Sequence, residues 1–246
     1  MNTSESALSG NAAAQNLELS PSELEYRLLM DNFITPEECR ELIALADKYG
    51  TVGGGYGEKV GQSNSDNEVY IGYFLKESQP TEEFRKEHEV ALRILNRVRK
   101  QLMKHFGLPF LWIDHAEILS REPTQPQEGA PPEDLSMDWH MDNHGPLIWR
   151  RTHTGILYLN DDYEGGHTCM KEADWGPFRE LPPATGRLIG FNAVETPHAV
   201  TKVTSGKRYT MIMWFSNHWT NVRRHIKVFN PKLANALGAL KRPAGR

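Results

Sequence analysis

The run RYTMIMWF, Arg208–Phe215, decides the fold of this 246-residue chain. Its aromatic and β-branched residues favour a strand, and alternation places Arg208, Thr210, Ile212 and Trp214 on one face. A guanidinium on an otherwise apolar inner face is unfavourable unless an anion meets it, and its planar fork fits a carboxylate. The run therefore predicts a strand whose Arg208 binds an acidic small molecule. The alternative is that Arg208 faces solvent or pairs with a structural acid.

Further strands are predicted upstream of this run, and they share its apolar and β-branched character. They cover 26–30, 116–121, 152–159, 187–191 and 198–203.

Two helices are predicted before most of these strands. Thr35, Pro36 and Glu38 have the spacing of a capping box with proline at the first helical position, which predicts a helix to about Lys48. A second helix is predicted from about 82 to 105, because apolar residues recur there at steps of three and four. Its apolar stripe indicates a support that packs on a sheet.

The order of these elements, helices first and strands afterwards, predicts an α+β, mainly β fold. The layout suits a double-stranded β-helix, a cupin-like jelly roll, buttressed by the N-terminal helices. We expect a disordered lead over 1–20 and a single folded domain over 21–220, with helical support in 35–106 and the β-helix core in 115–216. Residues 221–246 form a basic C-terminal extension.

Composition and charge narrow the classes of partner that this chain is expected to have. A net charge of −4 and a pI near 6.2 do not suggest a nucleic-acid partner. The two cysteines, Cys39 and Cys169, give no disulfide framework, and no stretch is long and apolar enough to cross a bilayer. With no secretory signal pattern at the start, we expect a cytoplasmic protein without a membrane partner. The oligomeric state stays open.

The extension over 221–246 carries seven Lys or Arg and no Asp or Glu. We expect a solvated basic helix over 231–241, with phosphate binding as the less favoured alternative.

A metal-binding pattern lies upstream of the deciding strand. His140 and Asp142 are two residues apart, so they would point to the same side of a strand, and His198 follows far downstream. Two histidines and one carboxylate occupy one face of a non-heme iron and leave the other face open. A single His-X-Asp pair is weak evidence, since a surface turn can have the same sequence. His198 and Arg208 strengthen the interpretation.

Several segments together resemble the Fe(II)/2-oxoglutarate dioxygenases of the prolyl hydroxylase superfamily, and most of all the catalytic domain of the leprecan-type prolyl 3-hydroxylases. These segments occur in the family's order and are 140–143, 154–161, 165–166, 186–191, 195–200, 203–206 and 208–215.

This resemblance implies that 21–220 is a dioxygenase domain with His140, Asp142 and His198 as iron ligands. Arg208 would bind the distal carboxylate of 2-oxoglutarate. Tyr158 would share that carboxylate, and Thr210 stands where the family has a small residue. Fe(II), 2-oxoglutarate and O2 would be needed, with ascorbate as an optional reductant.

The implied reaction is hydroxylation of an unactivated C–H bond with release of succinate and CO2. Asp142 supports hydroxylation, desaturation or ring formation, because halogenating relatives replace this carboxylate with a small residue. The chain departs from the family at His167, where an acidic residue usually follows the paired glycines. We place His144, His153 and His167 outside the ligand set.

The substrate is the open question. We expect an amino-acid-like or specialised small molecule in preference to a peptide. The alternatives are a peptidyl-prolyl or peptidyl-lysyl hydroxylase, a non-catalytic module that senses 2-oxoglutarate or metal, and a metal-dependent isomerase. Two loops are candidates for substrate contact, the glycine-rich 50–61 and the proline-rich 122–134.

Overall fold

A computed structural model describes residues 25–49, 82–123, 135–146, 148–171, 178–230 and 232–233. The predicted lead over 1–20, the glycine-rich loop and nearly all of the proline-rich loop lie outside these residues. Most of the predicted 231–241 helix does too.

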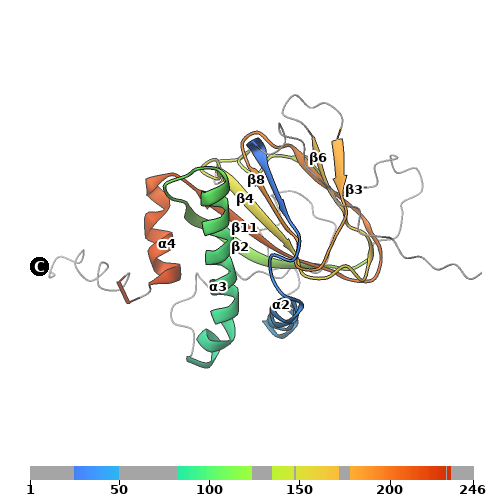
Figure 1. The fold of residues 1–246 in the computed structure, drawn as a ribbon, viewed down its shortest axis with the longest axis horizontal. Helices are drawn as coiled ribbons and strands as arrows, with labels where there is room; N and C mark the ends of the chain where they lie inside the picture. Colours follow the sequence, from blue (N-terminus) through green and yellow to red (C-terminus); the bar gives the residue numbers. More distant parts are fainter. Residues whose placement is uncertain are drawn as a thin grey trace, which may run out of the picture.

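The strands form two antiparallel sheets that face each other, as Figure 1 shows. The order in the larger sheet is β1 (Arg27–Met30), β8 (Leu188–Asn192), β4 (His153–Tyr158), β11 (Arg208–Ser216) and β2 (Trp112–Arg121). The order in the smaller sheet is β3 (Leu135–His140), β9 (His198–Thr201), β6 (Thr168–Lys171) and β7 (Phe178–Leu181). A short pair joins β10 (Val203–Ser205) to β5 (Glu164–Gly165). This is the predicted double-stranded β-helix.

Helix α2 (Pro36–Tyr49) begins with the predicted capping box. The Glu38 backbone N–H donates to Thr35 Oγ1 at 3.2 Å, and the Thr35 N–H donates to Glu38 Oε2 at 3.1 Å. Glu38 also accepts from Arg97 Nη1 at 2.7 Å, which fastens α2 to α3 (Glu82–His105). The cap therefore also positions the second helix.

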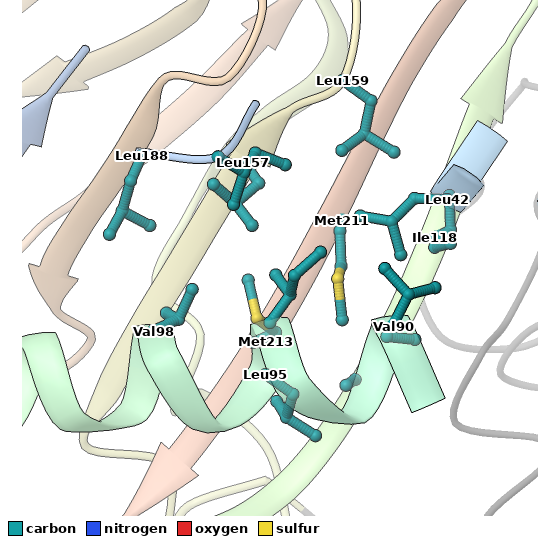
Figure 2. Close-up of a cluster of buried hydrophobic side chains, with 14 of the residues drawn as sticks. Leu42, Val90, Leu95, Val98, Ile118, Leu157, Leu159, Leu188, Met211 and Met213 are labelled. Carbon is teal, nitrogen blue, oxygen red and sulfur yellow. The ribbon is translucent and has the colours of Figure 1, made fainter. Parts of the chain in front are cut away.

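Helix α3 covers the outer face of the larger sheet (Figure 1). Its apolar stripe, including Val98 and Leu102, packs with residues of β4, β8 and β11 in one core, part of which is drawn in Figure 2. Gly155 on β4 permits this close approach, because a Cβ there would lie 2.7 Å from Val98 Cγ1. The predicted supporting role of this helix is confirmed.

Strand β11 separates two environments by alternation. Its even-numbered residues Arg208, Thr210 and Trp214 face the interior of the roll, while the odd-numbered residues lie in the core beneath α3. A second apolar cluster fills the roll between the sheets. It consists of Ile156, Tyr158, Tyr163, Met170, Leu181, Ile189, Phe191 and Val203. The interior of the roll therefore combines apolar walls with buried polar groups.

The chain continues after β11 into a short 3-10 turn, Trp219–Asn221, and helix α4 (Val222–Phe229). Asp114 on β2 accepts from Arg151 Nε at 3.0 Å, Asn221 Nδ2 at 3.0 Å and Arg224 Nη1 at 2.8 Å. This carboxylate anchors α4 to the sheet. The helix lies earlier in the chain than the one predicted over 231–241.

None of the helices in the described parts of the chain is long and apolar enough to cross a membrane. Cys39 and Cys169 are buried and form no disulfide bond with each other.

Candidate active site

The structure brings His140, Asp142 and His198 together. His140 ends β3 and lies opposite His198, the first residue of β9. Asp142 stands in the turn after β3, so it is not on the strand that the two-residue spacing suggested. One ligand atom from each residue lies within 4.8 Å of the others. The separations are 3.8 Å from His140 Nε2 to Asp142 Oδ1 and 3.7 Å from His198 Nε2 to Asp142 Oδ2.

Backbone carbonyls orient both imidazoles. His140 Nδ1 lies 2.7 Å from the carbonyl oxygen of Asp138, and His198 Nδ1 lies 3.1 Å from that of Thr196. Each Nδ1–H donates to its carbonyl, so each Nε2 presents a lone pair to the centre of the cluster. This is the arrangement that positions metal-binding histidines in proteins.

A hydroxyl holds the carboxylate of Asp142. Thr154 Oγ1 on β4 donates to Asp142 Oδ2 at 2.5 Å, and both residues are buried. The second carboxylate oxygen, Oδ1, points toward His140. Thr154 therefore joins the larger sheet to the cluster on the smaller sheet.

The protonation states of Asp142 and His198 at neutral pH favour metal binding. Burial opposes the charged form of Asp142, but His198, His140 and the Thr154 hydrogen bond outweigh it and lower the pKa of this carboxyl. Burial, and then the neighbouring His140, lowers the pKa of His198 to about 4. An ionised carboxylate and a neutral imidazole are the forms that bind a metal ion.

The three residues of the cluster differ in exposure. The side chain of His140 is 33% exposed, whereas those of Asp142 and His198 are buried. Among the three, His140 is the residue nearest to solvent.

Arg208 lies deeper in the roll and is buried with 2% exposure. Its Nη1 donates to Thr210 Oγ1 at 3.2 Å, but its Nε has no hydrogen-bond partner among the described residues. Gly166 makes room for it, because a Cβ there would lie 2.7 Å from Arg208 Cδ. Arg208 faces the interior, as predicted, and Thr210 contacts its guanidinium.

Tyr158 brings its ring to Arg208, whose guanidinium carbon lies 5.3 Å from the ring centroid. The hydroxyl is already bonded elsewhere. It accepts from the Thr168 N–H at 3.0 Å and lies 2.7 Å from Thr168 Oγ1 and 3.4 Å from the Leu181 carbonyl. The predicted role of Tyr158 toward 2-oxoglutarate stays a prediction.

Sequence reasoning missed Tyr163, which follows β4 in a loop rich in Asp and Asn. Tyr163 is buried, and its hydroxyl has no hydrogen-bond partner in the described structure. Burial raises its pKa, and the nearby Arg208 cation is the largest opposing effect. No periodic or motif signal marks this position, because loop residues follow no alternation.

Sequence reasoning also missed an acidic residue on the inner side of β2. Glu117 is buried and lies opposite Ile212 of β11, and its Oε2 is 3.2 Å from His115 Nε2. His115 in turn stacks on Trp214, with ring centroids 5.7 Å apart. The interior of the roll is therefore more polar near β2 than the apolar residues of the deciding strand suggest.

The metal-binding cluster found among the described residues contains none of His144, His153 and His167. His167 Nδ1 lies 2.5 Å from Glu180 Oε1. His153 packs on Phe106 with ring centroids 4.8 Å apart, and His144 is exposed.

Comparison with known proteins finds similarity to iron oxygenases. Residues 133–216 match the family model described as the 2OG-Fe(II) oxygenase superfamily. Prolyl 3-hydroxylase 2 of Homo sapiens is 31% identical over 209 residues, covering 77% of this chain and 29% of the relative. Prolyl 3-hydroxylase 1 of Rattus norvegicus is 28% identical over 208 residues, with shares of 77% and 28%. The chain thus spans less than a third of the length of these relatives.

Solved structures show the same fold. A prolyl-4-hydroxylase of Pseudomonas putida has a TM-score of 0.54 at 18% identity, covering 78% of this chain and 92% of its own. A prolyl hydroxylase of Trichoplax adhaerens, in complex with a hypoxia inducible factor peptide fragment, has a TM-score of 0.56 at 15% identity, with shares of 78% and 84%.

These comparisons confirm the predicted resemblance and correct one expectation. We expected a small-molecule substrate in preference to a peptide, and this expectation is wrong. The relatives in sequence are prolyl hydroxylases, and one structural neighbour is in complex with a peptide. The fold of a catalytic domain and its ligand set do not determine which substrate it takes.

Proposed function

We propose that this chain, which carries a 2OG-Fe(II) oxygenase domain, is a 2-oxoglutarate-dependent dioxygenase that hydroxylates a proline residue within a peptide or protein. One observation carries the proposal: the His-Asp-His cluster lies in the same roll as the buried Arg208, whose Nε has no hydrogen-bond partner among the described residues. The prolyl substrate rests on the names of the relatives in sequence.

The residues present fit the iron and the co-substrate that the family uses. His140, Asp142 and His198 would hold Fe(II) from one side, through two imidazole nitrogens and a carboxylate. When bound, iron with O2 and 2-oxoglutarate supplies the oxidising chemistry that yields succinate, CO2 and a hydroxylated product.

The protein contributes orientation and exclusion of water. Arg208 offers a guanidinium to the distal carboxylate of the co-substrate, in a wall where a cation without an anion would be unfavourable. Thr154 fixes the carboxylate of Asp142, and the apolar side chains of the roll, Ile156, Ile189 and Phe191 among them, limit the access of water.

The test is a turnover assay on a set of proline-containing peptides, with Fe(II), 2-oxoglutarate, ascorbate and air. We expect one substrate oxygen gained for each succinate formed, and none with a matched peptide in which alanine replaces proline. Amino-acid analysis then identifies the ring carbon that carries the hydroxyl. A gain of oxygen on lysine would favour the lysyl alternative, and absence of succinate with every peptide would favour the sensing module.

A further inference from the structure

Two stretches of the chain that lie outside the roll are rich in positive charge. Residues 143–152 and 216–233 together carry six Lys or Arg and no Asp or Glu, although the whole chain has a net charge of −4. The two stretches meet beside β11. The Thr152 N–H donates to the Phe215 carbonyl oxygen at 2.9 Å, and the Asn217 N–H donates to Thr152 Oγ1 at 3.2 Å. Positive charge is therefore concentrated in one part of an otherwise acidic protein.

The first stretch is connected to the metal-binding cluster at both ends. It follows Asp142 directly and leads into Thr154, whose hydroxyl donates to Asp142. Between them, Trp149 is 48% exposed, and its ring lies edge-on to that of His218 with centroids 5.2 Å apart. Trp219, the residue after His218, is 74% exposed. Two exposed tryptophans thus belong to one surface patch, and exposed apolar patches of this kind mark interaction sites.

Two cations of this region form no ion pair with the described residues. The guanidinium carbon of Arg150 lies 4.4 Å from the Trp149 ring centroid, and its Nε is buried with no hydrogen-bond partner in the described part of the chain. Lys227 on α4 is exposed and has no acidic partner there either. Both positive charges are therefore available to a partner molecule.

One buried carboxylate joins these cations to two others. Asp114 accepts from Arg151 Nε at 3.0 Å and from Arg224 Nη1 at 2.8 Å. Lys227 lies three residues after Arg224, so it occupies the same side of α4. Arg150, Arg151, Arg224 and Lys227 together with Asp114 leave a net charge of +3 in this region.

We call this region the basic surface, and it consists of Trp149, Arg150, His218, Trp219, Arg224 and Lys227. We propose that the basic surface binds an acidic segment of the protein that carries the target proline. Carboxylates would pair with the two available cations, and tryptophans are among the residues that contribute most to interfaces. The net charge of the whole chain disfavours a nucleic acid as the partner. The inference rests on the proposed function, and it adds the charge of the sequence around the proline.

The test measures peptide binding. Three fluorescein-labelled peptides have a central proline flanked on both sides by Glu, by Gln or by Lys. Fluorescence anisotropy on the Fe(II)-loaded full chain, with 2-oxoglutarate and without oxygen, gives the Kd of each peptide. At low salt we expect the Glu peptide to bind about tenfold more tightly than the Gln peptide, and the Lys peptide to bind most weakly. High salt should reduce these differences, because it screens exposed charges.

Variants locate the effect. The double variant Arg150→Gln/Lys227→Gln should reduce the preference for the Glu peptide over the Gln peptide about fivefold. Arg40→Gln/Lys104→Gln is the matched control, because it removes two exposed cations from α2 and α3 and should keep the preference. Lys227→Glu changes the charge by the same amount at one exposed position and should act like the first double variant. Because the preference is a ratio within each variant, partial unfolding does not alter it.

Equal Kd values for the Glu and Gln peptides in the wild-type chain, or an equal loss of preference in the control variant, overturns the basic surface as a docking site. Tighter binding of a single-stranded oligothymidylate, weakened by the same substitutions, would also overturn it in favour of a nucleic acid. Turnover in air separates these results from the proposed function. Hydroxylation of proline with no preference for acidic peptides keeps that function, whereas absence of hydroxylation with every proline peptide overturns it.

Discussion

The two faces of the larger sheet are made by the same strands and differ in almost every physical respect. On the outer face, Met211, Met213 and Phe215 of β11 are fully buried against α3 in an apolar core. On the inner face, Arg208 and Thr210 are equally buried but polar. The outer face stabilises the fold, whereas the inner face keeps hydrogen-bond donors available for a ligand. Equal burial therefore does not imply an equal role.

The largest expected effect is on activity, at the metal-binding cluster that Thr154 on the inner face contacts through Asp142. Replacing Asp142 by alanine removes the carboxylate from the His-Asp-His cluster, so we expect loss of iron binding and a fall in turnover of roughly a thousandfold or more. Metal analysis and succinate formation measure the two effects. The exposed Glu41→Ala serves as the control and should behave as wild type. Wild-type turnover in Asp142→Ala would contradict the site.

The second-largest effect is on stability, in the apolar core on the outer face of the larger sheet. Leu102 on α3 is fully buried in the outer core, and its replacement by alanine should lower the free energy of unfolding by about 3 kcal/mol. Denaturant titration measures this change. Turnover per folded molecule should be retained at low temperature. A variant with native stability and lost activity would show that the outer face contributes directly to the chemistry.

The third effect concerns pH. Burial lowers the pKa of His153, on β4, to about 4. The unfolded chain takes up a proton near pH 6.5 and the folded chain does not, so unfolding should become easier as the pH falls from 6.5 toward 4. At pH 5 this amounts to about 2 kcal/mol for this residue. His153→Leu should be less sensitive to acid than wild type in urea titrations at pH 7 and 5, and equal sensitivity would refute the claim.

The smallest effect is expected for Thr154, which links the two sheets through Asp142. Thr154→Val keeps the shape and removes the hydroxyl, so iron affinity should fall by about tenfold. Competition with a chelator measures the affinity. Thr152→Val, two residues earlier in the chain, is the comparison, because the Thr152 hydroxyl contacts the Asn217 N–H and His153 Nδ1 instead of Asp142. Equal losses in both variants would show that the hydrogen bond to Asp142 is unimportant.

Much of this comparison could be predicted from the sequence, because alternation is a local property. The run Arg208–Phe215 assigns its residues to the two faces correctly, and the capping box at Thr35 locates the start of α2. The ligand set was recognisable from residue types and order. These features depend on neighbours in the chain.

The remaining features depend on contacts between distant segments. Tyr163 lies in a loop, and its closeness to Arg208 arises only once β4 and β11 are paired. The occupied hydroxyl of Tyr158 depends on Thr168, which belongs to the opposite sheet. Helix α4 is short and basic, and its anchor is Asp114 on a strand far upstream. No periodic pattern in the sequence predicts these contacts between distant segments.

The opposition of His140 and His198 on neighbouring strands has a consequence for how much folded protein a cell contains. An ion bound by both residues and by Asp142 would act as a crosslink between β3, β9 and the turn that leads to β4. At a free metal concentration a hundred times its Kd, such binding stabilises a folded chain by about 2.7 kcal/mol. The lifetime of the protein would then follow the iron supply, so iron shortage would lower its abundance as well as its activity.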